Sequence, residues 1–503
     1  MLELLIIFPL VAALLTLILS NTFLGRFLLI CTAIIHSLLT AIILSKLATG
    51  DILSGFAGLL SPDMLGGIFL GIASGLFLMA SIYAVGYLKT EVDLGEHRNE
   101  INSRKKFTNA PERRFIACLC IFLAAMTLVV CTRHLGALWV GIEITTLASA
   151  PLIYFHRHQE SLEATWKYLI ICSVGIALAL LGNLLLSLAF AEYDLSEINN
   201  SMDQLNAFIH LAQNINSTSQ SMPWLKAAFI FFLVGYGTKM GLAPLHNWLP
   251  DAHSQAPSLV SALLSGALLN CALLGILRGH QVMIAAKLES FSSTLLIFFG
   301  LISLITAAIF IIDQGHYKRL LAYSSVEHMG IIAFAIGLGG PAIKGALLHT
   351  ICHSMTKAML FLLAGNILSR FHSLSSYDVR GMSKVMPLTT ILWTAGFFAI
   401  VGSPPFGLFV SEFWILKGAL IQGQFIYAGI YLLCLTIIFI GMSIPVLRMV
   451  QGSKTPDMRN SEPEPILTII SPLILGLGVL FLGLYIPQGL IDVLKNAALS
   501  IGG

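Results

Sequence analysis

The sequence predicts an all-α integral membrane protein of about fourteen transmembrane helices. Hydrophobic residues make up 57% of the 503 residues and charged residues only 11%, whereas soluble domains carry about 25% charged residues. Apolar runs of about twenty residues, long enough to cross a hydrocarbon core of about 30 Å, recur along the whole chain. The mean hydropathy of +0.87 is also typical of a chain surrounded by lipid.

The apolar runs give the predicted helices in order. The first run begins with Glu3, where a signal peptide would be basic, so we expect it to be kept as the first helix. A basic stretch at 88–113 and an acidic stretch at 191–222 interrupt the series. The predicted spans are 2–20, 25–46, 64–87, 114–131, 135–155, 163–190, 223–248, 257–279, 292–312, 320–339, 342–369, 387–420, 424–448 and 465–489.

Lysine and arginine fall unequally on the two sides of these spans. The loops after odd-numbered helices hold 17 of the 28, among them Arg104, Lys105 and Lys106, and the opposite face holds seven. Basic loops stay in the cytoplasm. We therefore expect a multi-pass protein of the cell (inner) membrane with both termini on the outer face.

Composition argues against several other classes. The net charge of +3 is too small to indicate nucleic-acid binding. The eight cysteines lie in apolar stretches and form no CxxC pair, so iron–sulfur clusters, structural zinc and a disulfide framework are not expected. We expect no cofactor in this chain and interpret the cysteines as small buried hydrophobic residues.

Ionisable side chains inside the predicted helices are the main functional signal. Such a group at the bilayer centre costs at least about 2.5–3.5 kcal/mol, so it marks an ion pathway or a buried ion pair that fixes helix packing. Near helix ends a long side chain also reaches the interface, which leaves both interpretations open for Lys417 and Glu163. The residues of this kind are Lys167, Lys239, Lys357, Lys417, Glu143, Glu163, Glu327 and Glu412.

Glu143 and Lys239 are predicted to form a first ion site. Glu143 lies in the middle of span 135–155, and a lone carboxylate there favours its neutral, protonated form. It keeps its charge only beside a cation, for which Lys239 is the candidate. A desolvated lysine can give up its proton, whereas arginine cannot. The pair would therefore work as a proton-exchange switch.

Two spans contain helix-breaking residues beside a charge. Pro244 and Pro250 follow Lys239, and Pro404 and Pro405 precede Glu412. Interrupted helices in matching places of two halves point to a transport site built on inverted repeats.

The predicted division into segments follows from these breaks. The chain would comprise an N-terminal three-helix segment at 1–113, a first repeat at 114–279, a second repeat at 280–448, and a cytoplasmic loop with the last helix at 449–503.

Between the two breaks, His349, His353 and Lys357 recur at every fourth position. They form a row on one helix face, and imidazoles both give and take protons near neutral pH. A metal site is the rival interpretation, but a third ligand would have to come from another helix. For either histidine alone, a structural role also stays open.

Several longer motifs resemble one family: the antiporter-like, proton-translocating membrane subunits of respiratory complex I, Mrp antiporters and membrane-bound nickel–iron hydrogenases. The motifs are GTKMGLAPLHNWLPDAHSQAPSLVSALL, YKRLLAYSSVEHMG, HTICHSMTKAMLFLLAGNI and SPPFGLFVSEF. The segments IEITTLASA and SSVEHMG resemble in particular component F of hydrogenase-4 and formate hydrogenlyase-type complexes.

This resemblance implies a fourteen-helix fold with two inverted five-helix repeats and discontinuous helices seven and twelve. It implies that Glu143 and Lys239 form the first half-channel pair and that Glu412 is the key residue of the second. We take His349, His353 and Lys357 as the relay between them. Supporting residues would be Lys167, Ser265, Asn270, Glu327 and His328.

Helix eight departs from the family pattern. Relatives often carry a histidine or lysine where this chain has Ser265 and Asn270, neither of which titrates. We therefore predict a hydrated cavity lined by these two side chains, Lys239 and His349, because bridging waters need polar partners. We also do not expect the long C-terminal lateral helix of the distal complex I subunit.

The leading functional hypothesis is a proton-pumping subunit that works with other membrane subunits and a peripheral redox arm of nickel–iron hydrogenase type. The equivalent subunit of complex I and a sodium/proton antiporter of the Mrp type are rivals that share the charged axis, so the ion is H⁺ or Na⁺. A rival of another class is a structural subunit whose charges only hold helices together.

Overall fold

The structure is a computed structural model that describes residues 1–19, 21–101, 109–191, 203–214, 221–452 and 463–503. Arg104, Lys105 and Lys106, on which part of the predicted orientation depends, lie outside the described residues.

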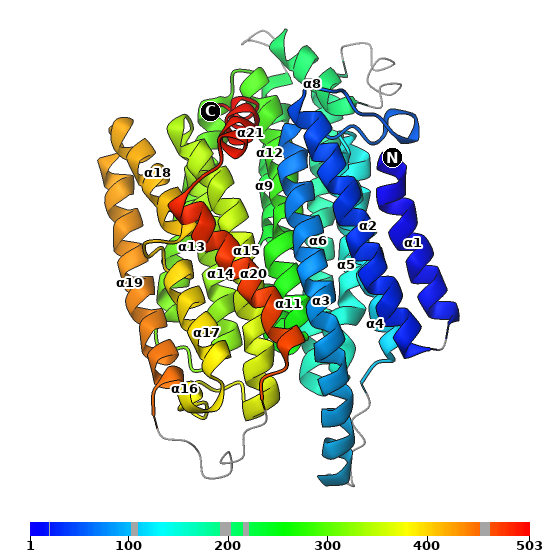
Figure 1. Ribbon diagram of the computed structural model, residues 1–503. Helices are drawn as coiled ribbons and strands as arrows, with labels where there is room; N and C mark the ends of the chain where they lie inside the picture. The colour runs from blue at the N-terminus through cyan, green and yellow to red at the C-terminus, as the bar shows by residue number, and fades with distance from the viewer. Residues whose placement is uncertain (20, 102–108, 192–202, 215–220, 453–462) are drawn as a thin grey trace.

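The described chain is an all-helical bundle (Figure 1), in agreement with the predicted class. The first half contains α1 (Leu2–Ile18), α2 (Thr22–Ala48), α3 (Met64–Ile101), α4 (Glu112–Cys131), α5 (Leu135–Ile153), α6 (Gln159–Ala189), α8 (Gln204–Gln213), α9 (Ser221–Met240), α10 (Trp248–Gln255), α11 (Ser258–Leu263) and α12 (Leu269–Ala285). The second half contains α13 (Glu289–Ile311), α14 (Tyr317–Leu338), α15 (Pro341–Phe371), α16 (Met382–Val385), α17 (Pro387–Ile400), α18 (Gly407–Ile421), α19 (Phe425–Val450), α20 (Ile466–Leu484) and α21 (Gln488–Leu499).

Helices overlap every predicted span. Among the described residues, 11 helices are long and apolar enough by themselves to cross a membrane, with α11, a π-helical turn at Leu264–Leu268 and α12 counted as one. The predicted span 387–420 is split into α17 and α18, and the span predicted at 223–248 ends early, because α9 stops at Met240 and α10 begins only at Trp248.

Three further helices of the described chain were not predicted: α8, α16 and α21. The span predicted at 465–489 ends at Leu484, and Pro487 then starts the separate helix α21. Proline is tolerated at a helix start because its missing N–H needs no partner there. Helix α21 buries Leu494, Ala497 and Ala498 and lies across one end of the bundle (Figure 1). The short helix α8 lies at the same end.

The centre of the bundle is fully enclosed by protein. The most apolar stretches of α14 and of the α11–α12 helix are 100% buried, whereas only 33–39% of the residues in those of α2, α6 and α13 are buried. Leu14 and Phe23 are among the large apolar side chains on the outer surface. Buried polar groups therefore gather in the middle, and the periphery suits lipid.

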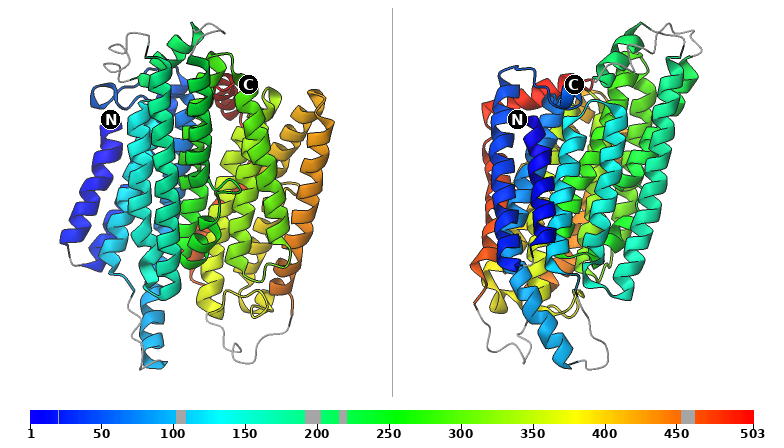
Figure 2. Two further views of the ribbon diagram at one scale, coloured as in Figure 1. Left: turned by 180° about the vertical axis from the view of Figure 1, so that it is seen from behind. Right: turned by 90° about the vertical axis from the view of Figure 1, so that its right-hand side faces the viewer.

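Both termini lie at the same end of the bundle (Figures 1 and 2). Helix α20 returns diagonally across the bundle and packs on α15 and α3, so the last span joins the two halves.

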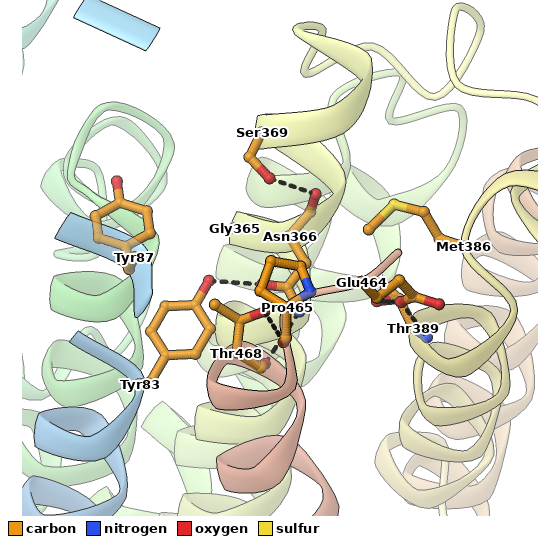
Figure 3. Close-up of a pocket in the computed structure, with 10 residues that line it drawn as sticks. All are labelled: Tyr83, Tyr87, Gly365, Asn366, Ser369, Met386, Thr389, Glu464, Pro465 and Thr468. Atoms are coloured by element: carbon orange, nitrogen blue, oxygen red, sulfur yellow. Dashed lines mark hydrogen bonds between the residues drawn. The ribbon is translucent and has the colours of Figure 1, made fainter. Parts of the chain in front are cut away.

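At the opposite end, a cavity of about 40 Å³ lies between α3, α15, α17 and α20 (Figure 3). The Glu464 carboxylate accepts hydrogen bonds from the backbone N–H groups of Leu388 and Thr389, both at 2.9 Å, and so caps α17. A carboxylate suits the positive end of a helix. Asn366 accepts a hydrogen bond from the Tyr83 hydroxyl and donates one to the Thr468 carbonyl. The residues that line this cavity have structural roles in capping and joining the helices.

Candidate functional site

The first helix break follows Lys239 directly. Helix α9 ends at Met240, and Gly241 takes the left-handed conformation with φ of 83°. Glycine has no Cβ to oppose this conformation. Pro244 lies in the break, but Pro250 lies in the first turn of α10, where proline is tolerated.

Side chains replace the backbone hydrogen bonds that the break removes. The Trp248 indole N–H donates to the Thr238 carbonyl at 2.8 Å, and the Ala243 N–H donates to the Ser303 hydroxyl at 2.9 Å. Non-helical backbone at membrane depth is tolerated only when protein or water satisfies it in this way.

Lys239 is fully buried, and two hydroxyl groups bind its ammonium. Nζ donates to Thr146 Oγ1 at 2.8 Å and to the Tyr168 hydroxyl at 2.6 Å, and it lies 4.4 Å from the centre of the Tyr168 ring. The Tyr168 hydroxyl also bonds Ser149 at 2.6 Å. The sequence patterns suggest neither the tyrosine nor the threonine as a partner of this lysine.

Glu143 and Lys239, the pair predicted for the first ion site, do not contact each other directly in the described structure. No ion pair joins them within the described chain; instead the Ser173 hydroxyl donates to Glu143 Oε1 at 2.8 Å, and Glu143 Oε2 is buried without a partner. Thr146 follows Glu143 by three residues on α5, so both lie on one helix face. The carboxylate therefore lies within electrostatic reach of Lys239 but not in contact with it.

Lys167, which we expected to support the axis, lies at the surface. Its ammonium contacts Glu163 at 2.7 Å and Asp251 at 3.0 Å, and 45% of its side chain is exposed. Successive helix residues point about 100° apart because a turn holds 3.6 residues. When Tyr168 points inward, its neighbour Lys167 therefore points away. Lys417 is also exposed.

The eighth predicted span, 257–279, corresponds to α11, the π-helical turn and α12, and we call it helix eight, which is distinct from the short α8. Helix eight contacts the second half through its two polar residues. Ser265 lies in the π-helical turn and bonds the Ser325 hydroxyl of α14 at 2.8 Å. The Asn270 amide donates to the Ser354 hydroxyl of α15 at 2.8 Å, and its Oδ1 is buried without a partner. π-Helical turns are common at functional sites.

The hydrated cavity predicted between Ser265, Asn270, Lys239 and His349 can be compared with these contacts. Asn270 is 1% exposed and faces α15, not lipid. Neither Ser265 nor Asn270 bonds Lys239 or His349 in the described structure, so the four side chains are not joined directly. Cys271 lies close enough to Lys239 for the two side chains to interact electrostatically, which brings helix eight beside the first site.

The second break lies between α17 and α18 and contains Pro404 and Pro405. Gly402 has φ of 65°, and a Cβ at this position would lie 1.9 Å from Glu412 Oε2. Glycine leaves room for the Glu412 carboxylate in its present position and tolerates the left-handed backbone. Glu412, in the second turn of α18, thus folds back against the break, and its Oε1 is buried without a partner.

Two histidines on adjacent helices form a hydrogen-bonded pair. His328 Nδ1 of α14 lies 2.9 Å from His349 Nε2 of α15, and His349 Nδ1 lies 2.9 Å from the Ser411 hydroxyl. Ser411 donates its own proton to the Leu408 carbonyl at 2.8 Å. His349 must therefore donate from Nδ1, which leaves a lone pair on Nε2 to accept from His328.

The rest of this cluster has unused hydrogen-bonding capacity. The His353 ring centre lies 5.1 Å from that of His328, and both His353 nitrogens lack a hydrogen-bond partner among the described residues. The same holds for His328 Nε2 and Glu327 Oε2. Lys357, by contrast, donates to the Leu321 carbonyl at 2.6 Å and to the Ser324 hydroxyl. Buried polar atoms without partners mark places for water, an ion or a strained catalytic group.

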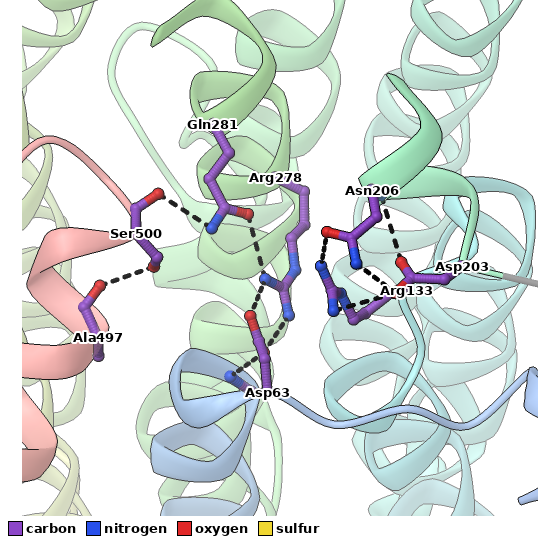
Figure 4. Close-up of polar contacts among 9 residues, drawn as sticks. Asp63, Arg133, Asp203, Asn206, Arg278, Gln281, Ala497 and Ser500 are labelled. Atoms are coloured by element: carbon purple, nitrogen blue, oxygen red, sulfur yellow. Dashed lines mark hydrogen bonds and ion pairs between the residues drawn. The ribbon is translucent and has the colours of Figure 1, made fainter. Parts of the chain in front are cut away.

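A buried ion pair that the sequence did not predict lies at the end of the bundle near the termini (Figure 4). Asp63, just before α3, contacts Arg278 of α12 at 2.6 Å. Burial alone would raise the pKa of Asp63, but the Arg278 guanidinium and the Gly66 N–H hold that pKa at about 2. Arg278 also donates to Gln281. Arg278 is one of the seven basic residues counted on the outer face in the sequence analysis. In the structure its side chain is fully buried and paired with Asp63.

Comparison with known proteins gives a consistent result. Residues 132–439 match the family model described as NADH:quinone oxidoreductase/Mrp antiporter, transmembrane. The chain is 34% identical over 444 residues to a hydrogenase-4 component F homolog of Methylacidiphilum infernorum, covering 87% of this chain and 88% of the relative.

Two solved structures share the fold. One is a subunit of the membrane-bound sulfane sulfur reductase, an archaeal respiratory membrane complex, with a TM-score of 0.82, 20% identity and coverage of 99% of this chain and 97% of the other. The second is a subunit of the Mrp complex from Dietzia sp. DQ12-45-1b, with a TM-score of 0.82, 18% identity and coverage of 99% and 96%.

Proposed function

Because the chain belongs to the NADH:quinone oxidoreductase/Mrp antiporter family of transmembrane subunits, we propose that it translocates protons as one subunit of a redox-driven membrane complex. The observation that carries this proposal is the enclosed His328–His349 pair. One ring donates to a lone pair of the other, and among the described residues the donor's second nitrogen makes no close hydrogen bond, with the Ile400 backbone carbonyl as a polar neighbour.

This pair has the geometry of a proton relay. A proton that reaches His328 Nε2 makes that ring cationic, and the ring can then pass its Nδ1 proton across 2.9 Å to His349 Nε2. Ser411 fixes the orientation of His349. The unpartnered atoms of His353 and Glu412 lie in the same buried region and suit bridging water.

The remaining buried charges would control when protons enter and leave. Lys239 is held by neutral hydroxyls, so it can release a proton to water without breaking an ion pair. Glu143 lies within electrostatic reach and would stabilise the charged lysine. Asn270, with one free oxygen, is the place where water would connect helix eight to α15.

The architecture of the proposal is the one predicted from the sequence: fourteen spans, with repeats at 114–279 and 280–448 that each contain one broken helix. The shared end of both termini is consistent with an even number of crossings. We propose that this end faces outward, because the opposite loops carry most lysines and arginines.

Membrane-bound hydrogenase is the proposed type of complex, because the relative that shares 34% identity is named a hydrogenase-4 component F homolog. The redox centre would lie in partner subunits. A complex I-type or Mrp-type assembly would use the same charged axis, so identifying the proteins that co-purify with this chain distinguishes the three. Dependence of transport on external Na⁺ would distinguish sodium from protons.

A structural role without transport is the second candidate. It is favoured by the direct bonds of Ser265 and Asn270 to Ser325 and Ser354, since neither residue of helix eight titrates.

The test is to reconstitute the purified complex in vesicles and to measure redox turnover and the pH gradient together. Glu143→Gln should abolish the gradient while the complex stays assembled. Glu163→Gln is the matched control because that carboxylate lies on the exposed face of α6. Normal pumping by Glu143→Gln would support the structural role.

A further inference from the structure

Three buried side chains from three helices converge near the second break. These are His328 of α14, His349 of α15 and Glu412 of α18. One nitrogen of each ring and one carboxylate oxygen lie within 4.8 Å of one another. We propose that these three residues form a binding site for Zn²⁺, with the fourth coordination position left to water.

The sequence alone points to a different pair. His349 and His353 have the spacing of zinc ligands on one helix, but the sequence offers no third ligand for them. In the structure the partners of His349 come instead from α14 and α18, and His353 is outside the group of converging ligand atoms. Only the packing of three helices creates this set.

The donor set suits zinc in particular. Two imidazoles and one carboxylate are ligands that zinc commonly takes, with distances of about 2.0–2.2 Å and tetrahedral geometry. Ligand atoms in such a site lie about 3.3 Å apart. The 2.9 Å between His328 Nδ1 and His349 Nε2 is close to this separation, so the carboxylate would make most of the adjustment. Mg²⁺ and Ca²⁺ prefer sites built from oxygen ligands.

The three side chains can present their ligand atoms to a metal with little loss of existing hydrogen bonds. Ser411 holds the Nδ1–H of His349, so Nε2 presents a lone pair, as in zinc sites where the second ring nitrogen is hydrogen-bonded. His328 can move its proton from Nδ1 to the unpartnered Nε2 and then bind through Nδ1. Glu412 Oε1 has no partner to lose.

The surrounding charges allow a divalent cation to be buried. Glu412 supplies one negative charge, and Glu327 lies within electrostatic reach of Glu412 and supplies a second. Lys357 and His353 also face the cluster, and a positive charge on either opposes the metal. Binding should therefore compete with protons and weaken at low pH.

A bound Zn²⁺ would take the position of the proton that His328 now shares with His349. It would thus block the relay, an effect that rests on the proposed function, whereas binding itself does not. The site would make the protein sensitive to zinc from inside its own transport path.

The binding experiment uses the assembled complex, purified without a histidine tag, with Co²⁺ as a visible-absorbing substitute for Zn²⁺. We expect tetrahedral Co²⁺ bands that Zn²⁺ displaces. His349→Gln and Glu412→Gln should each weaken binding more than about 100-fold, since loss of even an outer-shell partner costs about 10–100-fold. Size-exclusion chromatography shows whether each variant stays assembled.

His353→Gln is the matched control, because this buried histidine is one helical turn from His349 but outside the converging set. It should leave Co²⁺ binding unchanged. Bands that survive both His349→Gln and Glu412→Gln, the absence of tetrahedral bands in the unmodified complex, or equal loss in His353→Gln would overturn the site.

Inhibition is measured separately in vesicles. Zn²⁺ should stop proton translocation by the unmodified complex. If the vesicles do not pump even without metal, the proposed function fails while the binding result stands. If they pump and Zn²⁺ binds without slowing them, the blocking effect is wrong.

Discussion

The two broken helices carry ionisable groups of opposite type, a lysine and a glutamate, and the structure supplies hydrogen-bond partners for them to different extents. At the first break, the Lys239 ammonium precedes the interruption and donates to two hydroxyls. At the second break, the Glu412 carboxylate follows the interruption, and one oxygen has no partner. At both breaks a glycine, Gly241 or Gly402, adopts the left-handed backbone conformation. The two breaks thus share a backbone geometry but differ in how their ionisable side chains are hydrogen-bonded.

This difference suggests a division of labour. A buried charge with its hydrogen bonds made is held in place, whereas buried polar atoms without partners have room for water or an ion. The first half would hold a charge that responds to its neighbours, among them Glu143, whose Oε2 makes no hydrogen bond in the described structure. The second half, with free atoms on Glu327, His328, His353 and Glu412, would be where protons are exchanged.

The largest effect is expected at Lys239. Lys239→Met removes the titrating group but keeps an apolar side chain that suits the enclosed site. Because proton transfer by a positioned side chain is worth about 10²–10⁴-fold, pumping in vesicles should fall by at least about 100-fold. Lys167→Met is the control, since Lys167 lies on the exposed face of the adjacent α6. If Lys239→Met and Lys167→Met reduced pumping equally, the claim that the buried lysine has a special role would be wrong.

A large but indirect effect is expected at Gly402. Gly402→Ala would place a Cβ 1.9 Å from Glu412 Oε2 and also strain the backbone, so Glu412 must move. Proton translocation should fall to the level of Glu412→Gln. Gly423→Ala is the matched control, because Gly423 has φ of 70° but nothing within 4 Å of the added Cβ. It should cost about 1–2 kcal/mol of strain without loss of pumping.

A smaller effect is expected in helix eight. Asn270→Leu removes a hydrogen bond to Ser354 and the free Oδ1, but Ser354 still donates to the Thr350 carbonyl. Loss of about 1 kcal/mol corresponds to slowing of about fivefold. Asn270→Lys should retain more transport, because it restores a titratable group. Faster pumping by the leucine variant than by the lysine variant would argue against a water-bridged path there.

Local features of the fold were predictable from the sequence. Apolar length located the helices, and Pro244, Pro404 and Pro405 located both breaks, because these signals act within a few neighbouring residues. The end of the last span was predicted too late. The apolar run continues to residue 489, but α20 ends at Leu484, before Pro487.

Contacts between distant segments were much harder to predict. The partners of Lys239 come from α5 and α6, and nothing in one sequence shows that a tyrosine and a threonine would take the place expected for Glu143. In the same way, Arg278 resembles a loop residue by its position along the chain, although Asp63 holds it in the interior. His328 is only a supporting candidate until the packing of α14 on α15 brings it to His349.

The central claim is that the second half exchanges protons, and Glu412→Gln tests it most directly. The measurement is the number of protons moved per electron transferred, taken on the same vesicles with the assembled complex. We predict that electron transfer continues at a reduced rate while the proton-to-electron ratio falls below about one tenth of its normal value. An unchanged ratio would contradict the account.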